Sequence, residues 1–177
     1  YYVSGAELES AREHIETLTR LNAMTPRLRY LNARAQYQNG DLSVAAEMMQ
    51  DVVEEAPDDP DYAHFLGVVQ FERGSYATAE RYFEDAIRLN NEAWSSRFYL
   101  GRVALAQGDD VEGEDAEKHY EDALKALQEV HDKRSTNAEY HYYLGVALEK
   151  VGRGNEAMKE YKRLLSRTRF DEDDDPS

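Results

Sequence analysis

The chain has 177 residues and a strongly acidic composition, with 21 Lys and Arg against 36 Asp and Glu and a formal net charge of −15. This charge argues against nucleic acid as a partner, because phosphates attract Lys and Arg. No stretch approaches the ~20 consecutive apolar residues of a membrane-spanning helix, which excludes an integral membrane domain. The absence of Cys excludes a disulfide framework, a thiolate metal site and a Cys nucleophile.

A repeat with a period of 34 residues runs through the chain. Glycine and alanine both recur at this spacing, in the sets Gly40, Gly74 and Gly108, and Ala11, Ala45 and Ala79. The pair Leu66-Gly67 recurs after 34 residues as Leu100-Gly101 and after 44 residues as Leu144-Gly145. Agreement between independent positions indicates a tandem repeat, in which each unit must stack on its neighbours to bury its apolar faces.

Residues 1–25 fit the same register. Ala11, Ile15 and Leu18 lie on one face of a helix at the spacing i, i+4, i+7, so we expect the second helix of a partial repeat here. Residues 1–3 would form the last turn of that repeat's first helix, which indicates more repeats upstream. The alternative is an irregular segment that caps the N-terminal end of the array.

Residues 60–93 show most clearly that each unit contains two helices. The spacing of small and apolar residues predicts a first helix with one face at Ala63, Leu66, Gly67 and Gln70, and a second with one face at Ala79, Phe83, Ala86 and Ile87. Gly74 is expected to adopt the left-handed conformation that ends the first helix, and Ser75 to cap the second. We expect Gly67, Gly101 and Gly145 to allow close packing of the paired helices.

These positions resemble the tetratricopeptide repeat, a helix–turn–helix unit of 34 residues with Leu-Gly early, Gly-Asp at the turn, and an Ala followed four residues later by an aromatic residue. The resemblance implies an all-α fold, a tetratricopeptide-like α-solenoid of about four and a half helix–turn–helix repeats forming a right-handed superhelix. It divides the chain into a partial repeat at 1–25, repeats at 26–59, 60–93, 94–137 and 138–170, and an acidic, disordered tail at 171–177. Two positions depart from the pattern, with Asn32 in place of Leu and Arg153 in place of the turn Asp.

The third repeat, residues 94–137, is ten residues longer than the others. The alignment of Gly108 with Gly74 predicts three extra residues in the acidic turn before Ala116 and seven after Tyr120, lengthening the second helix. Such added helical turns would project and could carry a contact, and the alternative is a tolerated surface insertion. The acidic turn does not match an EF-hand loop, because Gly108 stands where the first Asp ligand should be.

Residues that carry chemistry form no recognisable catalytic or metal-binding pattern. None of the five His stands in a zinc-type spacing with other His residues or carboxylates. Neither a glycine-rich phosphate loop nor a Gly-x-Ser-x-Gly elbow occurs. We therefore expect no enzyme activity, no cofactor and no metal site.

The chain is rich in aromatic residues, with 13 Tyr, 5 Phe and 1 Trp, and many fall on the first helices. Stepping along these helices away from the Leu-Gly face gives the predicted partner-binding residues: Tyr30, Arg34, Tyr37, His64, Val68, Phe71, Phe98, Arg102, Leu105 and Tyr142. In the family that the chain resembles, the first helices line a concave groove in which peptides or partner helices bind. Exposed aromatic and Arg side chains are typical of hot spots. The alternative is that many of these residues pack between neighbouring first helices as core.

The sequence thus predicts a non-catalytic module that binds a peptide or helix of a protein partner in this groove, within a larger scaffold or assembly protein. The Lys and Asn residues with which one subgroup of the family grips a terminal carboxylate are missing. The net charge favours a partner with basic residues, and the competing interpretation is that Arg34 and Arg102 pair with an acidic motif. A second hypothesis is structural, namely self-association through the uncapped ends of the stack.

Overall fold

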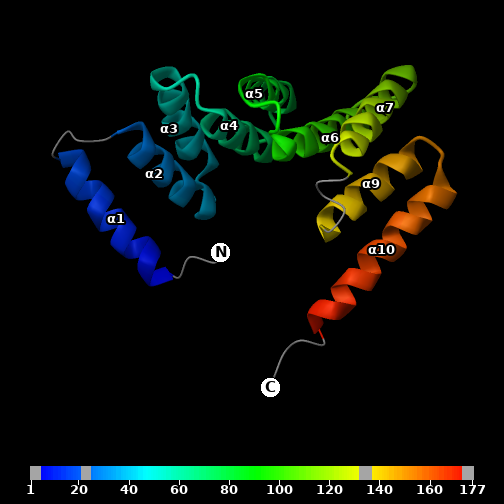
Figure 1. The fold of residues 1–177 in the computed structure, drawn as a ribbon. Coiled ribbons are helices and arrows are strands. Elements are labelled where there is room, and N and C mark those ends of the chain that lie inside the picture. The colour runs from blue at the N-terminus through cyan, green and yellow to red at the C-terminus, as the bar shows by residue number, and fades with distance from the viewer. Residues whose placement is uncertain (1–4, 21–24, 132–136, 173–177) are drawn as a thin grey trace. The chain divides into compact units, whose positions relative to one another are not determined.

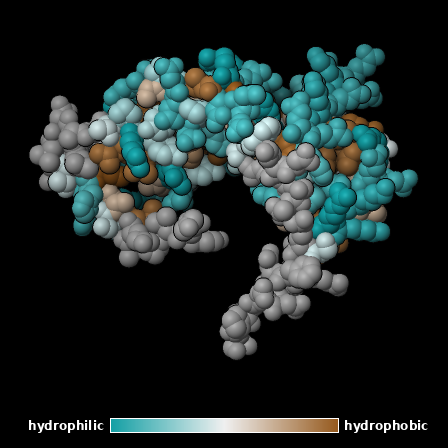
Figure 2. All heavy atoms as spheres, viewed as in Figure 1, coloured by the Kyte–Doolittle hydropathy of each residue, from teal (hydrophilic) through white to brown (hydrophobic). Residues whose placement is uncertain are grey.

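The computed structural model of the chain describes residues 5–20, 25–131 and 137–172 (Figure 1). Over these residues the chain forms nine α-helices and no strand. The helices are α1 (Gly5–Arg20), α2 (Pro26–Gln38), α3 (Leu42–Glu55), α4 (Pro60–Glu72), α5 (Tyr76–Leu89), α6 (Trp94–Asp109), α7 (Glu114–Glu129), α9 (Ala138–Lys150) and α10 (Gly154–Glu172). Most of the surface visible in Figure 2 is hydrophilic, and apolar residues appear there in separate small patches.

The helices belong to two compact units, Tyr1–Asn90 and Asn91–Ser177. In the first unit α2 pairs with α3 and α4 pairs with α5, and α3 also packs against α4. In the second unit α6 pairs with α7 and α9 pairs with α10, and α7 also packs against α9. Each pair consists of consecutive helices joined by a short connection, so the arrangement is that of a helix–turn–helix repeat.

The short connections depend on glycine. Gly40, Gly74 and Gly152 follow α2, α4 and α9 and have φ angles of 86°, 74° and 78°, in the left-handed region that favours glycine. Ser75 is the N-cap residue of α5, but its side chain makes no capping hydrogen bond, contrary to our expectation. The turn is closed instead by the backbone N–H of Ser75, which donates to the carbonyl oxygen of Gln70 at 2.9 Å.

The first helices of the pairs have side-chain caps at their N-termini. A side-chain oxygen of the N-cap residue accepts a backbone N–H of the first turn in α2, α4 and α9, and these residues are Thr25, Asp59 and Asn137. Such a cap stabilises a helix by about 1 kcal/mol. The capping residues explain why the first helices begin where they do.

The glycines of the Leu-Gly pairs lie where the two helices of a pair touch. A Cβ atom on Gly67 would lie 2.7 Å from the ring of Phe83, and one on Gly145 would lie 2.4 Å from the ring of Tyr161. Side-chain atoms do not approach this closely, so only glycine permits the observed packing. The expected packing role of these glycines is confirmed.

The ten extra residues of the third repeat do not lie where the sequence alignment places them. A Cβ atom on Gly101 would lie 2.6 Å from Cγ of Leu127, so Leu127 is the counterpart of Phe83 and Tyr161. The separation from Gly67 to Phe83 and from Gly145 to Tyr161 is the same, whereas that from Gly101 to Leu127 is ten residues longer. All ten residues therefore lie between Gly101 and Leu127.

The insertion lengthens both helices of the α6–α7 pair toward their connecting turn. Gly108 is helical and buried against the ring of Tyr120, and the left-handed turn glycine is Gly113, with a φ of 69°. The hydroxyl of Tyr120 donates to the carbonyl oxygen of Gly108 at 2.9 Å, which holds the added part of the pair together. The alignment of Gly108 with the turn glycines was therefore wrong, and so was the expected lengthening of α7 after Tyr120.

Two expectations concern the ends of the chain. Residues 1–3, expected in a preceding helix, and residues 173–177 of the expected tail lie outside the described residues. Asp171 and Glu172 are helical, so the disordered tail does not begin at residue 171. The helix continues to this point because neither Gly nor Pro follows Gly154 before residue 176.

Candidate interaction surfaces

In the first unit, aromatic side chains of α2 and α4 form a continuous cluster. The ring of Tyr30 lies 5.1 Å from that of Tyr62 and 5.5 Å from that of Phe65, measured between centroids. Phe65 also meets the ring of Tyr37 edge-on at 5.6 Å. The guanidinium group of Arg34 lies 5.6 Å from the centre of the Tyr30 ring. The contacts join the two first helices of this unit.

In the second unit, an arginine lies between two tyrosines on α6 and α9. The guanidinium carbon of Arg102 is 4.7 Å from the ring centre of Tyr99 and 4.7 Å from that of Tyr143. Arg102 also donates a hydrogen bond of 3.2 Å to Oε1 of Glu139. Burial raises the pKa of the Tyr143 hydroxyl, so this tyrosine stays neutral. We call Tyr99, Arg102, Glu139 and Tyr143 the tyrosine–arginine cluster.

One aromatic pairing occurs at equivalent positions in both units. Phe65 of α4 meets Tyr30 of α2 nearly edge-on, and Tyr143 of α9 meets Phe98 of α6 edge-on at 5.8 Å. Such T-shaped pairs contribute ~1 kcal/mol beyond the burial of their area. The position of Tyr30 and Phe98 is therefore one on which the next first helix packs.

The predicted partner-binding residues differ widely in exposure. Val68, Phe98 and Leu105 are only 7%, 3% and 5% exposed, so the expectation of accessible side chains is wrong at these positions. Phe98 is covered by the rings of Tyr99, Tyr140 and Tyr143, and Leu105 belongs to the same apolar core. The remaining residues are half-buried or exposed, and they are Tyr30, Arg34, Tyr37, His64, Phe71, Arg102 and Tyr142.

The sequence analysis missed an apolar column one position further along each first helix. Its members are large and at least partly accessible in every repeat, and they are Leu31, Phe65, Tyr99 and Tyr143. Their separations, 34, 34 and 44 residues, equal the period of the Leu-Gly pairs. The period itself could therefore have identified this column.

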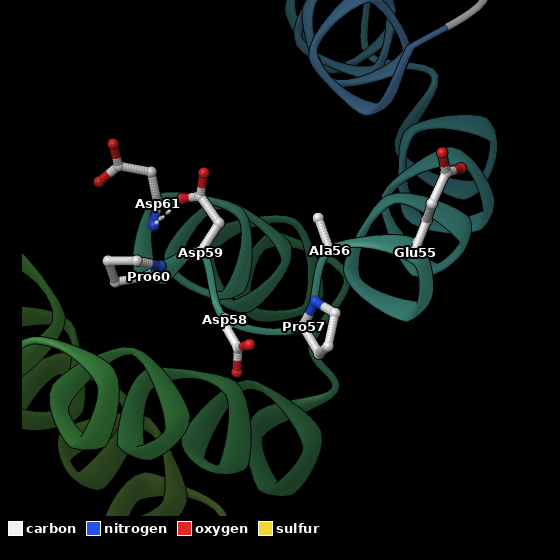
Figure 3. Close-up of a pocket in the computed structure, with 7 residues that line it drawn as sticks. All are labelled: Glu55, Ala56, Pro57, Asp58, Asp59, Pro60 and Asp61. Carbon is white, nitrogen blue, oxygen red and sulfur yellow. Dashed lines mark hydrogen bonds between the residues drawn. The ribbon is translucent and has the colours of Figure 1, made fainter.

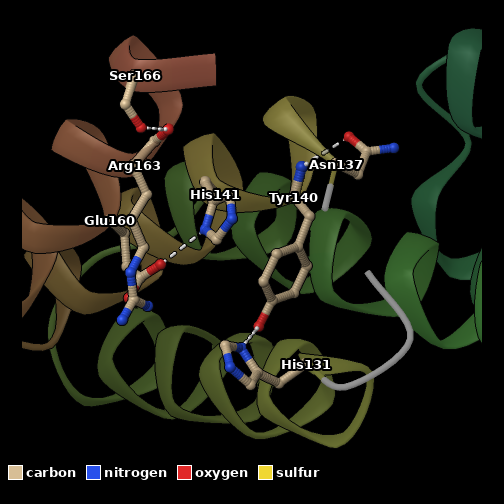
Figure 4. Close-up of polar contacts among 7 residues, drawn as sticks. All are labelled: His131, Asn137, Tyr140, His141, Glu160, Arg163 and Ser166. Atoms are coloured by element: carbon tan, nitrogen blue, oxygen red, sulfur yellow. Dashed lines mark hydrogen bonds and ion pairs between the residues drawn. The ribbon is translucent and has the colours of Figure 1, made fainter. Parts of the chain in front are cut away.

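A polar cluster lies between α7, α9 and α10 in the second unit (Figure 4). The buried side chains of His141 and Glu160 are hydrogen-bonded at 2.8 Å, and Arg163 donates to the other carboxylate oxygen of Glu160 at 2.6 Å. The hydroxyl of Tyr140 and Nδ1 of His131 are hydrogen-bonded at 3.0 Å. These groups border a cleft of about 450 Å³. They satisfy one another's hydrogen bonds, as buried polar groups in a helix interface must.

A second concavity, of about 490 Å³, lies at the connection between α3 and α4 (Figure 3). It is lined by residues 55–61, which include three aspartates. One of these, Asp59, accepts the backbone N–H of Asp61 at 2.9 Å and so begins α4. In the part of the chain that the structure describes, no group of three or more His, Asp or Glu residues is placed to hold a metal ion. The described helices also include none that is long and apolar enough to cross a membrane.

Paired helices, close glycine contacts and aromatic first helices define a helical-repeat solenoid. Two family models described as Tetratricopeptide repeat match the sequence, one over residues 1–60 and 66–119 and the other over residues 116–173. The chain belongs to the tetratricopeptide repeat family. Members of this family are generally non-catalytic and bind protein partners, which makes the chain a protein-interaction scaffold module.

Solved structures share this fold. A crystal structure of MamA matches with a TM-score of 0.75 at 16% identity, covering 98% of this chain and 99% of that one. MamA 41-end from Desulfovibrio magneticus RS-1 matches with a TM-score of 0.70 at 16% identity, covering 94% and 98%. TTC0263, a thermophilic protein of the same family in Thermus thermophilus, matches with a TM-score of 0.71 at 17% identity, covering 80% and 74%. No curated protein sequence matches.

Proposed function

We propose that the chain binds an extended or helical segment of a protein partner on the aromatic faces of its first helices, without catalysing a reaction. The observation that carries this proposal is the tyrosine–arginine cluster, in which two half-buried tyrosines and an arginine lie together on the surface of the second unit. Tyrosine and arginine are enriched among the residues that dominate binding energy at protein interfaces. The aromatic cluster around Tyr30 and Phe65 offers similar groups in the first unit.

The tyrosine–arginine cluster is ordered before any partner arrives. Arg102 is stacked between two rings and hydrogen-bonded to Glu139, so its long side chain loses little conformational freedom on binding. Ordering a flexible side chain at an interface costs about 0.5–1.5 kcal/mol, and this cost is reduced here. Rigid anchors of this kind favour affinity through slow dissociation.

The partner segment that suits this surface has basic residues beside its apolar anchors. The net charge of −15 attracts cations, and the faces of tyrosine rings bind Lys and Arg side chains. Arg102 already binds Glu139, so an acidic motif would have to compete with a carboxylate that is in place. This supports the basic partner over the competing interpretation in which Arg102 receives an acidic motif.

A peptide selection tests the proposal. Short random peptides displayed on phage are selected on the immobilised chain and counter-selected on a Tyr99→Ala, Tyr143→Ala variant. We expect the enriched peptides to combine aromatic or aliphatic residues with Lys or Arg. A matched control is Tyr82→Ala, because Tyr82 is a half-buried tyrosine on the second helix α5. Peptides that bind the counter-selection variant as well as the native chain would contradict the proposal.

A further inference from the structure

The last helix pair leaves open a face that is covered in the preceding pair. α9 packs against α7 and covers Phe98 and Leu124, which are 3% and 8% exposed. The repeat places Tyr142 and Met158 at the equivalent positions of the last pair, and these side chains are 47% and 55% exposed. The difference arises because, among the described helices of this unit, none lies on α9 and α10 as α9 lies on α7.

The open face is formed by both helices of the last pair, which lie side by side in Figure 1. We call it the terminal face, and its residues are Tyr142, Gly145 and Glu149 of α9 with Met158, Tyr161 and Leu165 of α10. The ring of Tyr161 lies against Gly145, and its hydroxyl donates to Oε2 of Glu149 at 2.9 Å. Burial and this carboxylate raise the pKa of Tyr161 to about 12, so the phenol remains neutral. Leu165, at 64%, is more exposed still.

The edge of the terminal face is basic, although the chain as a whole is acidic. Residues 158–169 contain a single carboxylate, Glu160, and five basic residues: Lys159, Lys162, Arg163, Arg167 and Arg169. Glu160 is buried and bonded to His141 and Arg163. Lys162 and Lys159 are exposed. A cationic border therefore lies along the α10 side of an apolar face.

We propose that the terminal face docks an acidic amphipathic helix of a partner protein, seated as α9 is seated on the preceding pair. The apolar face and its basic edge match such a helix in shape and in charge. This site is separate from the tyrosine–arginine cluster, and the proposal does not depend on the function proposed above.

The seat of α9 indicates what the docked helix carries. Rings of α9 at Tyr140 and Tyr143 pack on Phe98, so the incoming helix needs two large apolar residues three positions apart to pack on Tyr142. The hydroxyl of Tyr140 bonds to His131, whereas the equivalent position of the terminal face is Leu165. An apolar side chain without a hydroxyl therefore fits better there than tyrosine.

A basic amphipathic helix can also bind an anionic membrane surface. The terminal face includes the carboxylate of Glu149, which anionic lipid headgroups would repel, and the equivalent face of the preceding pair is filled by a helix. These observations favour a protein helix as the occupant.

Two synthetic peptides test the docking site. Both copy α9, residues 138–150, with Tyr140→Leu, and they differ only in having Glu or Lys at the positions that face solvent in α9. Fluorescence anisotropy with the whole chain is expected to show tighter binding of the acidic peptide. Met158→Glu combined with Leu165→Glu should weaken that binding roughly tenfold or more. Val44→Glu is the matched control, because Val44 is also an exposed apolar residue, at 45%, on α3.

Several results would overturn the proposal. Equal or tighter binding of the basic peptide would contradict the charge argument, and unchanged binding to the double variant would contradict the site. A dimer in sedimentation that the double variant abolishes would assign the face to a second copy of the chain. Binding to phosphatidylserine vesicles that the same variant abolishes would assign it to lipid. The Tyr99→Ala, Tyr143→Ala variant, which tests the first-helix surface, should still bind the acidic peptide.

Discussion

Gly101 and Leu127 lie so close that a Cβ atom on the glycine would be 2.6 Å from Cγ of the leucine. Gly108 and Tyr120 make the same kind of contact seven residues further along α6 and seven residues earlier on α7. The two contacts follow one another in an antiparallel helix pair. The third repeat is therefore a longer version of the common unit, with its added residues held by a second glycine contact.

Gly101→Leu should destabilise the chain by about 1–3 kcal/mol, because the new side chain would collide with Leu127 across the α6–α7 interface. Urea unfolding followed by circular dichroism measures the change. Gly154→Leu is the control, since nothing lies within 4 Å of a Cβ atom at that exposed position. An equal denaturation midpoint for Gly101→Leu and the native chain would show that this helix pairing is wrong.

Phe98→Ala should cost about 3–5 kcal/mol of stability, because Phe98 is a core residue that touches three tyrosine rings. Tyr142→Ala, at the equivalent exposed position of the last pair, should cost less than ~1 kcal/mol. Thermal and urea unfolding of both variants provide the comparison. Similar losses for the two would contradict the assignment of Phe98 to the core and of Tyr142 to an open face.

The period of the sequence was sufficient to predict the helices, their pairing and the packing role of Gly67 and Gly145. It misplaced the insertion, because Gly108 stands at the repeat spacing from Gly74 while serving a different purpose. A glycine that accommodates the Tyr120 ring and a glycine that forms a left-handed turn are indistinguishable in one sequence. Only the contact between Gly101 and Leu127 fixes the register.

The candidate site was only partly predictable from sequence. Helical spacing identified the correct helices, but exposure depends on which neighbouring helix covers a position. Phe98 is covered by α9 and Tyr142 is open, although both occupy the same place in their repeats. Spacing also missed Tyr99 and Tyr143, because the chosen face began one residue too early.

Arg102→Met should destabilise the second unit by about 1 kcal/mol, because it removes the cation from between the rings of Tyr99 and Tyr143. A double-mutant cycle with Tyr143→Leu isolates this contribution, and the coupling free energy should be favourable and of similar size. Arg102→Lys should retain only part of it, since Lys lacks the planar group that stacks on a ring. Independent effects of the two substitutions would show that the sandwich contributes no stability.

The ion pair between Asp109 and Lys150 should produce a small pH dependence. The hydrogen bond from Lys150 lowers the pKa of Asp109, and the hydrogen bond to Asp109 raises the pKa of Lys150. Because the pKa of Asp109 is lower in the folded chain, its stabilisation is present above the unfolded pKa of ~3.9 and is lost as the pH falls through the folded pKa. The pair is largely exposed, so its contribution at neutral pH should stay below ~1 kcal/mol.

NMR titration of the Asp109 carboxyl carbon measures this effect directly. Lys150→Met should move the pKa of Asp109 upward, toward its ordinary value. Glu156→Gln is a suitable control, because Glu156 pairs with Arg153 and not with Lys150. A pKa of Asp109 that does not change in Lys150→Met would show that the pair does not persist in solution.

The affinity of one selected peptide for four forms of the chain tests most directly whether partners bind on the first-helix surface. Isothermal titration calorimetry would compare the native chain with Tyr99→Ala, Tyr143→Ala and the second-helix control Tyr82→Ala. Our account predicts that each of the first two substitutions weakens binding by about 2 kcal/mol, roughly thirtyfold, and that the control binds like the native chain. Unchanged affinity in both first-helix variants, together with loss of binding in Tyr82→Ala, would contradict it.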